Sequence, residues 1–259
     1  MGIALVRDDD LLVERAIRNV VGFCDEMFLV DHRSRDETPQ ILAGLAASEP
    51  TLSFHPAKHP RESHDLIKGL AGSATWVFGV DGDEIYDPRG LPGFRARLLA
   101  GEFDDAWFIK GNVLHCDSID IERREATGWL APPARSITKL FNFAAIDSWE
   151  GNTPERLEGG APVFRPGYDG DAIRWLRDEY TWETSPFRCL HACFLPRSSR
   201  DSGRSFARRS FVDRSMDPPW TRTLTLARSA LGFPEQSQWK LTRYRQGERT
   251  TVDATGFFG

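Results

Sequence analysis

Residues Trp76–Glu84 read WVFGVDGDE, an apolar run followed at once by acidic side chains. The run predicts a short buried strand, and the end of that strand brings Asp81 and Asp83 onto a turn, one residue apart. Gly82 between them has no side chain, which lets a ligand approach the backbone. Mg2+ and Mn2+ prefer carboxylate and phosphate oxygens, so this turn is a candidate metal site. The alternative is a polar turn without a ligand, because Asp-Gly is common in turns.

Strand and helix patterns alternate on the amino-terminal side of this stretch. The expected strands are residues 2–6, 27–30 and 52–55, and the expected helices are residues 11–24, 38–47 and 63–71. Asp10 and Thr38 are candidate N-caps, and Pro39 suits the first turn of a helix. The alternation predicts an α/β fold, a mostly parallel sheet flanked by helices. Ligands bind beyond the carboxyl ends of such strands, which is where the polar clusters after Val6, Val30 and Val80 fall.

The carboxyl-terminal side of the chain is less regular. The expected strands are residues 106–114, 137–143 and 187–195, with a helix over 171–179 and loops over 151–168 and 198–215. No linker separates the two sides. We therefore expect one domain over residues 1–259, formed of two lobes at about 1–110 and 111–259.

Charge and hydropathy exclude several classes of protein. The chain has 33 basic and 38 acidic side chains, a net charge of −5, which speaks against general nucleic-acid binding. The charge is uneven, because the stretch from Arg197 to Arg249 holds 12 basic and 5 acidic residues. No apolar run reaches the ~20 residues of a membrane span, and Met1–Asp10 does not resemble a signal peptide.

The chain contains four cysteines, Cys24, Cys116, Cys189 and Cys193. Without a secretory signal, they are expected to be reduced thiols of a cytoplasmic protein. Cys189, His191 and Cys193, with His115 and Cys116 elsewhere in the chain, could suggest zinc, but the usual C-x2-C spacing is absent.

A second acidic motif follows the strand expected at residues 27–30. It reads DHRSRDET and places Asp31, Ser34, Asp36 and Thr38 in an Asp-x-x-Ser-x-Asp-x-Thr pattern. Together with the later Asp-x-Asp-Glu of residues 81–84, this order and spacing resembles the family 2 type of glycosyltransferase, which has the GT-A nucleotide-diphospho-sugar transferase fold. The resemblance covers about residues 1–110. It departs at His32, Arg33 and Glu37, where residues that are often small or acidic stand in that family.

The resemblance implies roles for individual residues. Asp83 and His191 would bind a divalent metal, Mn2+ or Mg2+, that bridges the diphosphate of a nucleotide-diphospho-sugar. The residues that would contact the nucleotide sugar are Val6, Arg7, Asp8, Asp31, Arg61, Asp81, Gly82 and Arg204. The first lobe would then bind the donor, and the second, with its basic carboxyl-terminal segment, the acceptor.

Each of these roles has a simpler alternative. Ser34, Asp36 and Thr38 suit loop hydrogen bonds and a helix cap. A histidine among apolar residues such as His191 is commonly a satisfied core residue. The arginines between Arg197 and Arg209 could close over phosphate groups, form a solvated charge run, or contact an anionic membrane surface.

An inverting transferase needs a carboxylate base beside the acceptor hydroxyl. Asp171 resembles the acidic residue that begins a helix in the acceptor half of family 2 enzymes, and Glu179 and Glu183 are competitors. A helix N-cap would explain Asp171 without catalysis, and a retaining enzyme requires no such base.

We therefore expect a metal-dependent glycosyltransferase that moves a sugar to an acceptor hydroxyl on a glycan, a lipid-linked molecule or a natural product. The rival interpretations are a phosphatase of the haloacid-dehalogenase type, a sugar nucleotidyltransferase and a non-catalytic sugar-binding relative. A haloacid dehalogenase usually carries its Asp-x-Asp on the first strand, whereas three strands are expected before it here.

Overall fold

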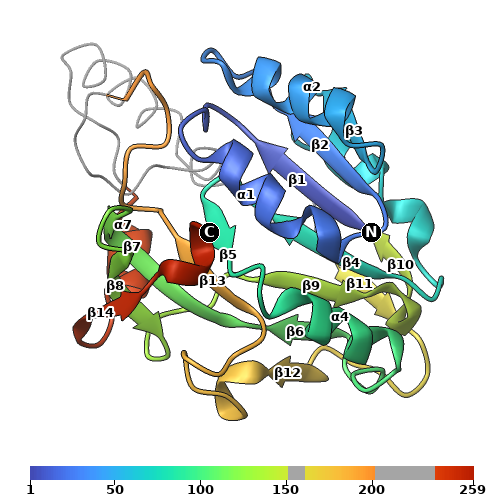
Figure 1. Cartoon of the computed structure of the whole chain (residues 1–259). Helices are drawn as coiled ribbons and strands as arrows, with labels where there is room; N and C mark the ends of the chain where they lie inside the picture. Colours follow the sequence, from blue (N-terminus) through green and yellow to red (C-terminus); the bar gives the residue numbers. More distant parts are fainter. Residues whose placement is uncertain (151–160, 202–236) are drawn as a thin grey trace, which may run out of the picture.

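A seven-stranded sheet forms the centre of the computed structural model, which describes residues 1–150, 161–201 and 237–259 (Figure 1). Its strand order is β12-β6-β9-β4-β1-β2-β3. The bounds are β1 Gly2–Val6, β2 Met27–Asp31, β3 Leu52–Pro56, β4 Trp76–Val80, β6 Phe108–Lys110, β9 Lys139–Asn142 and β12 Ile173–Trp175. Only β9 runs antiparallel to its neighbours, which confirms the predicted mostly parallel sheet.

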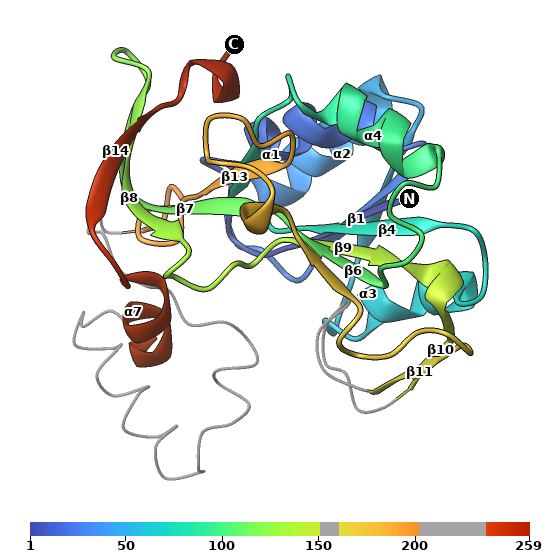
Figure 2. The same ribbon diagram turned by 90° about the horizontal axis from the view of Figure 1, so that it is seen from below.

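Helices cover both faces of this sheet. Helices α1 (Val13–Val20), α2 (Thr38–Ser48) and α4 (Leu91–Leu99) lie on one face (Figure 2). Helix α3 (Glu62–Asp65) and the hairpin of β10 (Ile146–Glu150) and β11 (Ala161–Phe164) lie on the other. Successive strand residues point to opposite faces. Phe78 accordingly packs into the core under α1, α2 and α4, and Val77 into the core on the opposite face.

A five-stranded sheet of order β14-β8-β7-β13-β5 lies beside the first. Its strands are β5 Glu84–Tyr86, β7 Asn112–Asp120, β8 Glu125–Ala131, β13 Arg188–His191 and β14 Arg249–Asp253. Because β5 begins directly after Asp83, the acidic turn connects the two sheets. The two lobes therefore exchange strands, since β9 and β12 enter the first sheet and β5 enters the second.

The structure corrects several expected elements. The helix predicted over residues 171–179 is wrong, because β12 pairs with the edge strand β6 and only one 3-10 turn, Leu176–Asp178, follows. The helix predicted over 63–71 is broken into α3 and the 3-10 turn Lys68–Leu70. The strand predicted over 187–195 ends at His191, and the predicted loop 151–168 contains β11. Residues 151–160 of that loop and 202–215 of the arginine-rich loop lie outside the described residues.

All four cysteines are buried and free. Among the described residues, every helix is too short or too polar to cross a membrane.

Candidate functional site

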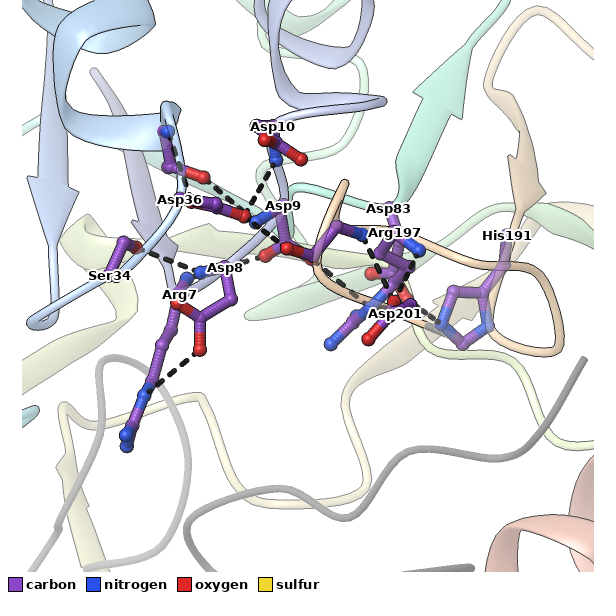
Figure 3. Close-up of polar contacts among 12 residues, drawn as sticks. Arg7, Asp8, Asp9, Asp10, Ser34, Asp36, Asp83, His191, Arg197 and Asp201 are labelled. Atoms are coloured by element: carbon purple, nitrogen blue, oxygen red, sulfur yellow. Dashed lines mark hydrogen bonds and ion pairs between the residues drawn. The ribbon is translucent and has the colours of Figure 1, made fainter. Parts of the chain in front are cut away.

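Asp83 occupies the centre of a buried polar cluster at the carboxyl edge of the large sheet (Figure 3). Its Oδ2 accepts a hydrogen bond from Nη1 of Arg197 and lies 3.5 Å from Nε2 of His191. Burial would raise the pKa of the Asp83 carboxyl, but the guanidinium of Arg197 beside it holds the pKa well below its ordinary value. The structure thus brings together the two predicted metal ligands, Asp83 and His191.

Arg197 also faces a second carboxylate, since its Nε lies 3.1 Å from Oδ1 of Asp9. Asp9 follows β1 and is 3% exposed. Burial acts against the charged guanidinium, yet Asp83 and Asp9 together raise the pKa of Arg197 above its ordinary value. Two carboxylates that would repel each other are therefore held together by one arginine.

The loop that carries Arg197 is anchored to the strand ends. Ser198 donates from its hydroxyl to Asp36 Oδ2, 2.6 Å away, and Ser199 donates from its backbone to Asp10 Oδ1, also 2.6 Å away. Asp10 was predicted to cap the first helix, and this is wrong, because α1 begins after Leu12 and Asp10 binds the arginine loop instead. The residues that follow Arg197 are thereby tied to Asp36 by a side-chain hydroxyl and to Asp10 by a backbone N–H.

The loops after β1 and β2 are joined by hydrogen bonds between backbone and side chain. Asp8 donates from its backbone to Ser34 Oγ, 2.8 Å away, and accepts from the backbone of Arg35. Thr38, predicted to be an N-cap, is instead the first residue of α2, and its hydroxyl accepts from the backbone of Asp9. Asp8 and Arg33 have φ values of 52° and 57°. Such strained backbone is tolerated where the surroundings over-determine it, as this network does.

Asp31 ends β2 beside Val6 of β1. Its Oδ2 accepts from the backbone of Ser34, while its Oδ1 is buried and accepts no hydrogen bond from the described residues. Burial raises the pKa of this carboxyl, against the hydrogen bonds from Ser34. Because a buried acceptor is costly to leave unpaired, Asp31 is suited to receive a ligand N–H or O–H.

Asp81 is held by Lys139. Nζ of Lys139 lies 2.9 Å from Oδ2 of Asp81 and 2.6 Å from Oε1 of the fully buried Glu84. Burial raises the pKa of Glu84 to about 8 despite the ammonium group beside it. Lys139 therefore pairs with the carboxylate of Asp81, and it also donates to a carboxyl group that is mostly protonated at pH 7.

The missing side chain of Gly82 leaves space that neighbouring residues of the protein occupy. A Cβ at this position would meet the side chains of Val6 and Asp9, the latter at 2.8 Å. The absence of a side chain thus lets the acidic turn pack against the end of β1, and the space expected for a ligand is filled by these two residues.

A basic hollow of about 360 Å3 opens beyond the ends of β1, β2 and β3. It is lined by Arg7, His32, Arg33, Arg35, Lys58 and His59. Burial and then Arg7 lower the pKa of His32 to about 4, so this ring is neutral at pH 7. The hollow suits an anionic ligand, which would lie close to Asp31.

Behind His191 lies a second histidine, His115, on β7. The two Nδ1 atoms are 2.8 Å apart, and Cys193 Sγ is 3.9 Å from Nδ1 of His115. His115, His191 and Cys193 place their ligand atoms within 4.8 Å of one another. Burial lowers the pKa of both rings, further in His115, where His191 adds to it.

The residues at the centre suit a hard divalent cation. Carboxylate oxygen and imidazole nitrogen are ligands that Mn2+ accepts, with Mg2+ favouring the oxygen. Two ligand atoms that are each ~2.1 Å from one ion lie ~3–4 Å apart, and Asp83 Oδ2 and His191 Nε2 are separated by 3.5 Å. The guanidinium of Arg197 already neutralises the carboxylate of Asp83. A cation at this place would therefore share that carboxylate with the guanidinium or displace the guanidinium from it.

Other predicted residues lie apart from this cluster. Arg61 is exposed in the loop after β3 and donates from its backbone to His59. Asp171 is exposed in the turn before the amino end of the outermost strand β12, whereas Asp83 follows the carboxyl end of the central strand β4. Arg204 lies outside the described residues.

Two residues of the site, Asp9 and Lys139, escaped prediction, and His115 was named only as a possible zinc ligand. Asp9 stands in a run of three aspartates, and the run alone does not show which one points inward. Lys139 carried a signal, since it is a single lysine in an otherwise uncharged strand segment, Ile137–Phe143. His115 meets His191 only through the parallel pairing of β7 with β13, which no local pattern reveals.

Comparison with known proteins gives slight similarities. No family model and no curated protein matches the chain. Among solved structures, it is similar to the mannosyltransferase PcManGT from Pyrobaculum calidifontis in complex with GDP-Man and Mn2+, with 18% identity and a TM-score of 0.31 over 45% of this chain and 35% of that one. The chain thus spans about a third of that enzyme's length. It is also similar to 4-diphosphocytidyl-2C-methyl-D-erythritol synthase from Anaerococcus prevotii, with 13% identity and a TM-score of 0.29 over 57% of this chain and 72% of that one.

Proposed function

We propose that this chain is a metal-dependent glycosyltransferase that uses a nucleotide-diphospho-sugar donor. The observation that carries the proposal is the approach of Asp83 and His191 to 3.5 Å at the carboxyl edge of a parallel sheet. Substrates of α/β sheets bind at this edge. The orphaned oxygen of Asp31 and the basic hollow beside it supply the further contacts that a nucleotide requires.

In this proposal the donor lies across the ends of β2, β1 and β4. Asp31 accepts a hydrogen bond from the base or ribose, and the backbone at Val6, Arg7 and Asp8 borders the nucleoside. Asp81, held by Lys139, contacts the ribose or the hydration shell of the cation.

Asp83 and His191 would hold Mn2+ or Mg2+. When bound, the cation would act as a Lewis acid and stabilise the negative charge of the leaving nucleoside diphosphate. Arg197 lies beside these ligands and is suited to pair with a phosphate oxygen. Its loop, tied to Asp10 and Asp36, closes one side of the site and limits access of water. Asp171 takes no part in this arrangement, because it precedes the amino end of β12 and the site lies at the carboxyl ends of the strands.

Thermal stabilisation by nucleotides tests this proposal. UDP, GDP, dTDP and CDP are each added with and without Mn2+, and one of them should raise Tm by a few degrees only with the metal. Asp83→Asn should abolish that shift. Asp65→Asn, which removes an exposed carboxylate on α3, is the charge-matched control and should leave it intact.

Product analysis then separates glycosyl transfer from its rivals. The proposal expects a nucleoside diphosphate released from a nucleotide sugar. Pyrophosphate released from a nucleoside triphosphate and a sugar phosphate would instead show nucleotidyl transfer, and phosphate released from a phosphomonoester would show a phosphatase. Metal-independent nucleotide binding would also contradict the proposal.

A further inference from the structure

The His115–His191 pair forms part of a continuous hydrogen-bonded chain. Strands β7 and β13 run parallel with these two residues in register, so both rings point to the same face of the sheet. Nδ1 of one lies 2.8 Å from Nδ1 of the other. Exactly one proton must lie between the two nitrogens, because two protons would clash and two lone pairs would repel.

The hydrogen bond at the other nitrogen of His115 decides which of the two Nδ1 atoms carries that proton. Nε2 of His115 lies 2.8 Å from the backbone carbonyl of Arg135, and a carbonyl only accepts. His115 therefore donates from Nε2, and in the neutral ring its Nδ1 is the acceptor. The thiol of Cys193, 3.9 Å from the same Nδ1, is a further donor directed at it. The proton shared by the two rings consequently belongs to Nδ1 of His191.

With its proton on Nδ1, His191 presents a lone pair at Nε2. That lone pair faces Asp83 Oδ2 across 3.5 Å, and a carboxylate oxygen cannot donate. Two acceptors facing each other at this distance are unfavourable by themselves and favourable around a cation. The chain of hydrogen bonds thus prepares His191 as a ligand before any ion arrives.

We propose that His115 is a positioning residue that fixes His191 in the Nδ1–H tautomer, with Nε2 directed at the cation site beside Asp83. The inference rests on the proposed function, since it concerns the metal of that site. Partners of the second nitrogen are known to orient metal-bound imidazoles and to tune their affinity. Here that partner is another histidine, itself held by Arg135 and by Tyr244, whose ring stacks on it at 4.2 Å with an interplanar angle of 6°.

The tautomer is measurable without metal. Long-range 1H–15N correlation NMR of the apo protein distinguishes the two nitrogens of each ring. We expect His191 as the Nδ1–H tautomer and His115 as the Nε2–H tautomer. A His191 ring protonated at Nε2, alone or together with Nδ1, would overturn the inference.

Two variants test the consequence for metal affinity. His115→Phe keeps an aromatic ring for Tyr244 to stack on and removes the acceptor, so Mn2+ affinity measured by calorimetry should fall ~10–100-fold. His115→Asn places an amide oxygen near the former Nδ1 and should retain most of the affinity. Equal affinity in all three proteins would show that His115 has no positioning role.

Zinc between His115, His191 and Cys193 is the competing arrangement, and Co2+ distinguishes it. A Co2+–thiolate bond gives an intense charge-transfer band, and such a band that is lost in Cys193→Ser would overturn the inference. Absence of Mn2+ binding in a protein with the expected tautomers would instead overturn the metal centre of the proposed function.

Discussion

Arg197 donates a hydrogen bond to Asp83, a residue 114 positions earlier in the chain. The same guanidinium faces Asp9 after β1. A cationic side chain therefore already neutralises the carboxylate that the proposed metal would use, and competition between the two cations follows.

Replacing Arg197 with Gln should separate metal binding from nucleotide binding. Mn2+ affinity of the nucleotide-free protein should rise about tenfold, because a charged hydrogen bond that competes for Asp83 is lost. Affinity for the nucleoside diphosphate should fall, because a phosphate partner is lost. Calorimetric titration measures both. Arg200→Gln is the control, since the side chain of Arg200 is exposed and binds the backbone of Arg35; unchanged Mn2+ affinity in the Arg197 variant would refute the competition.

Gly82→Ala should destabilise the fold and disturb Asp83. The added methyl group meets Val6 and Asp9, so we expect a loss of about 1–3 kcal/mol in the free energy of unfolding. Gly44→Ala is the matched control, because its Cβ has open space in α2 and should stabilise by about 0.4–1 kcal/mol. Chemical denaturation measures both changes. Equal effects at the two positions would mean that the close packing at Gly82 has no energetic consequence.

Lys139→Met should destabilise the protein by about 1–3 kcal/mol, because it removes the buried ammonium group that donates to Asp81 and to Oε1 of Glu84. The double variant Lys139→Met, Glu84→Gln should lose less than the sum of the two single variants, because the hydrogen bond between the two residues can be lost only once. A double-mutant cycle from urea unfolding measures the coupling. Additive losses would show that the two residues do not interact.

Asp87 and Arg188 form a buried ion pair at the junction of β5 and β13, with Nη2 to Oδ2 at 2.7 Å. Burial opposes the charge of Asp87, but hydrogen bonds from Arg89 and Arg188 hold its pKa below the ordinary 3.8. Asp87→Asn should cost about 3–5 kcal/mol at pH 7, because Arg188 then lies buried without its anion.

The pH dependence of this pair has a definite sign. A depressed carboxyl pKa stabilises the fold above pH 3.8, and this stabilisation is lost as pH falls below 3.8 through the folded-state pKa. The difference between wild type and Asp87→Asn should therefore be constant from pH 7 to 5 and shrink towards pH 3. Arg89→Ala, at a side chain that is 54% exposed, should cost under ~1 kcal/mol. A pH-independent difference would exclude the ionised Asp87 as its source.

Local patterns were sufficient for the amino-terminal half of the fold. Strands β1 to β4 and helices α1 and α2 follow from apolar runs and periodicity, because each buries a face whose spacing is visible in the sequence. The carboxyl ends of those strands also located Asp31, Asp81 and Asp83. Strand β12 could not be predicted, because Ile173–Trp175 gains its backbone hydrogen bonds from the distant edge of β6.

The cluster around Asp83 shows the same limit at the level of side chains. For Arg197 the sequence left open phosphate contact, a solvated charge run and membrane contact, whereas in the protein it pairs with two carboxylates from separate loops. Lys139 and His115 reach the site through strand pairings between distant segments. Such contacts depend on register, and a shift of one residue would turn either side chain to the opposite face.

The acidic turn at Asp81–Asp83 connects β4 of one sheet to β5 of the other, so it forms the junction between the two sheets. Asp9 follows a strand of the first sheet and His191 ends a strand of the second, and Arg197 links Asp9 to Asp83 at the junction. A cation bound by Asp83 and His191 would add a second link at this junction and would restrict the motion of the two sheets relative to each other. Binding of the cation should therefore slow amide hydrogen exchange along β5 and β13, so that the rigidity of the junction between the sheets depends on occupancy of the site.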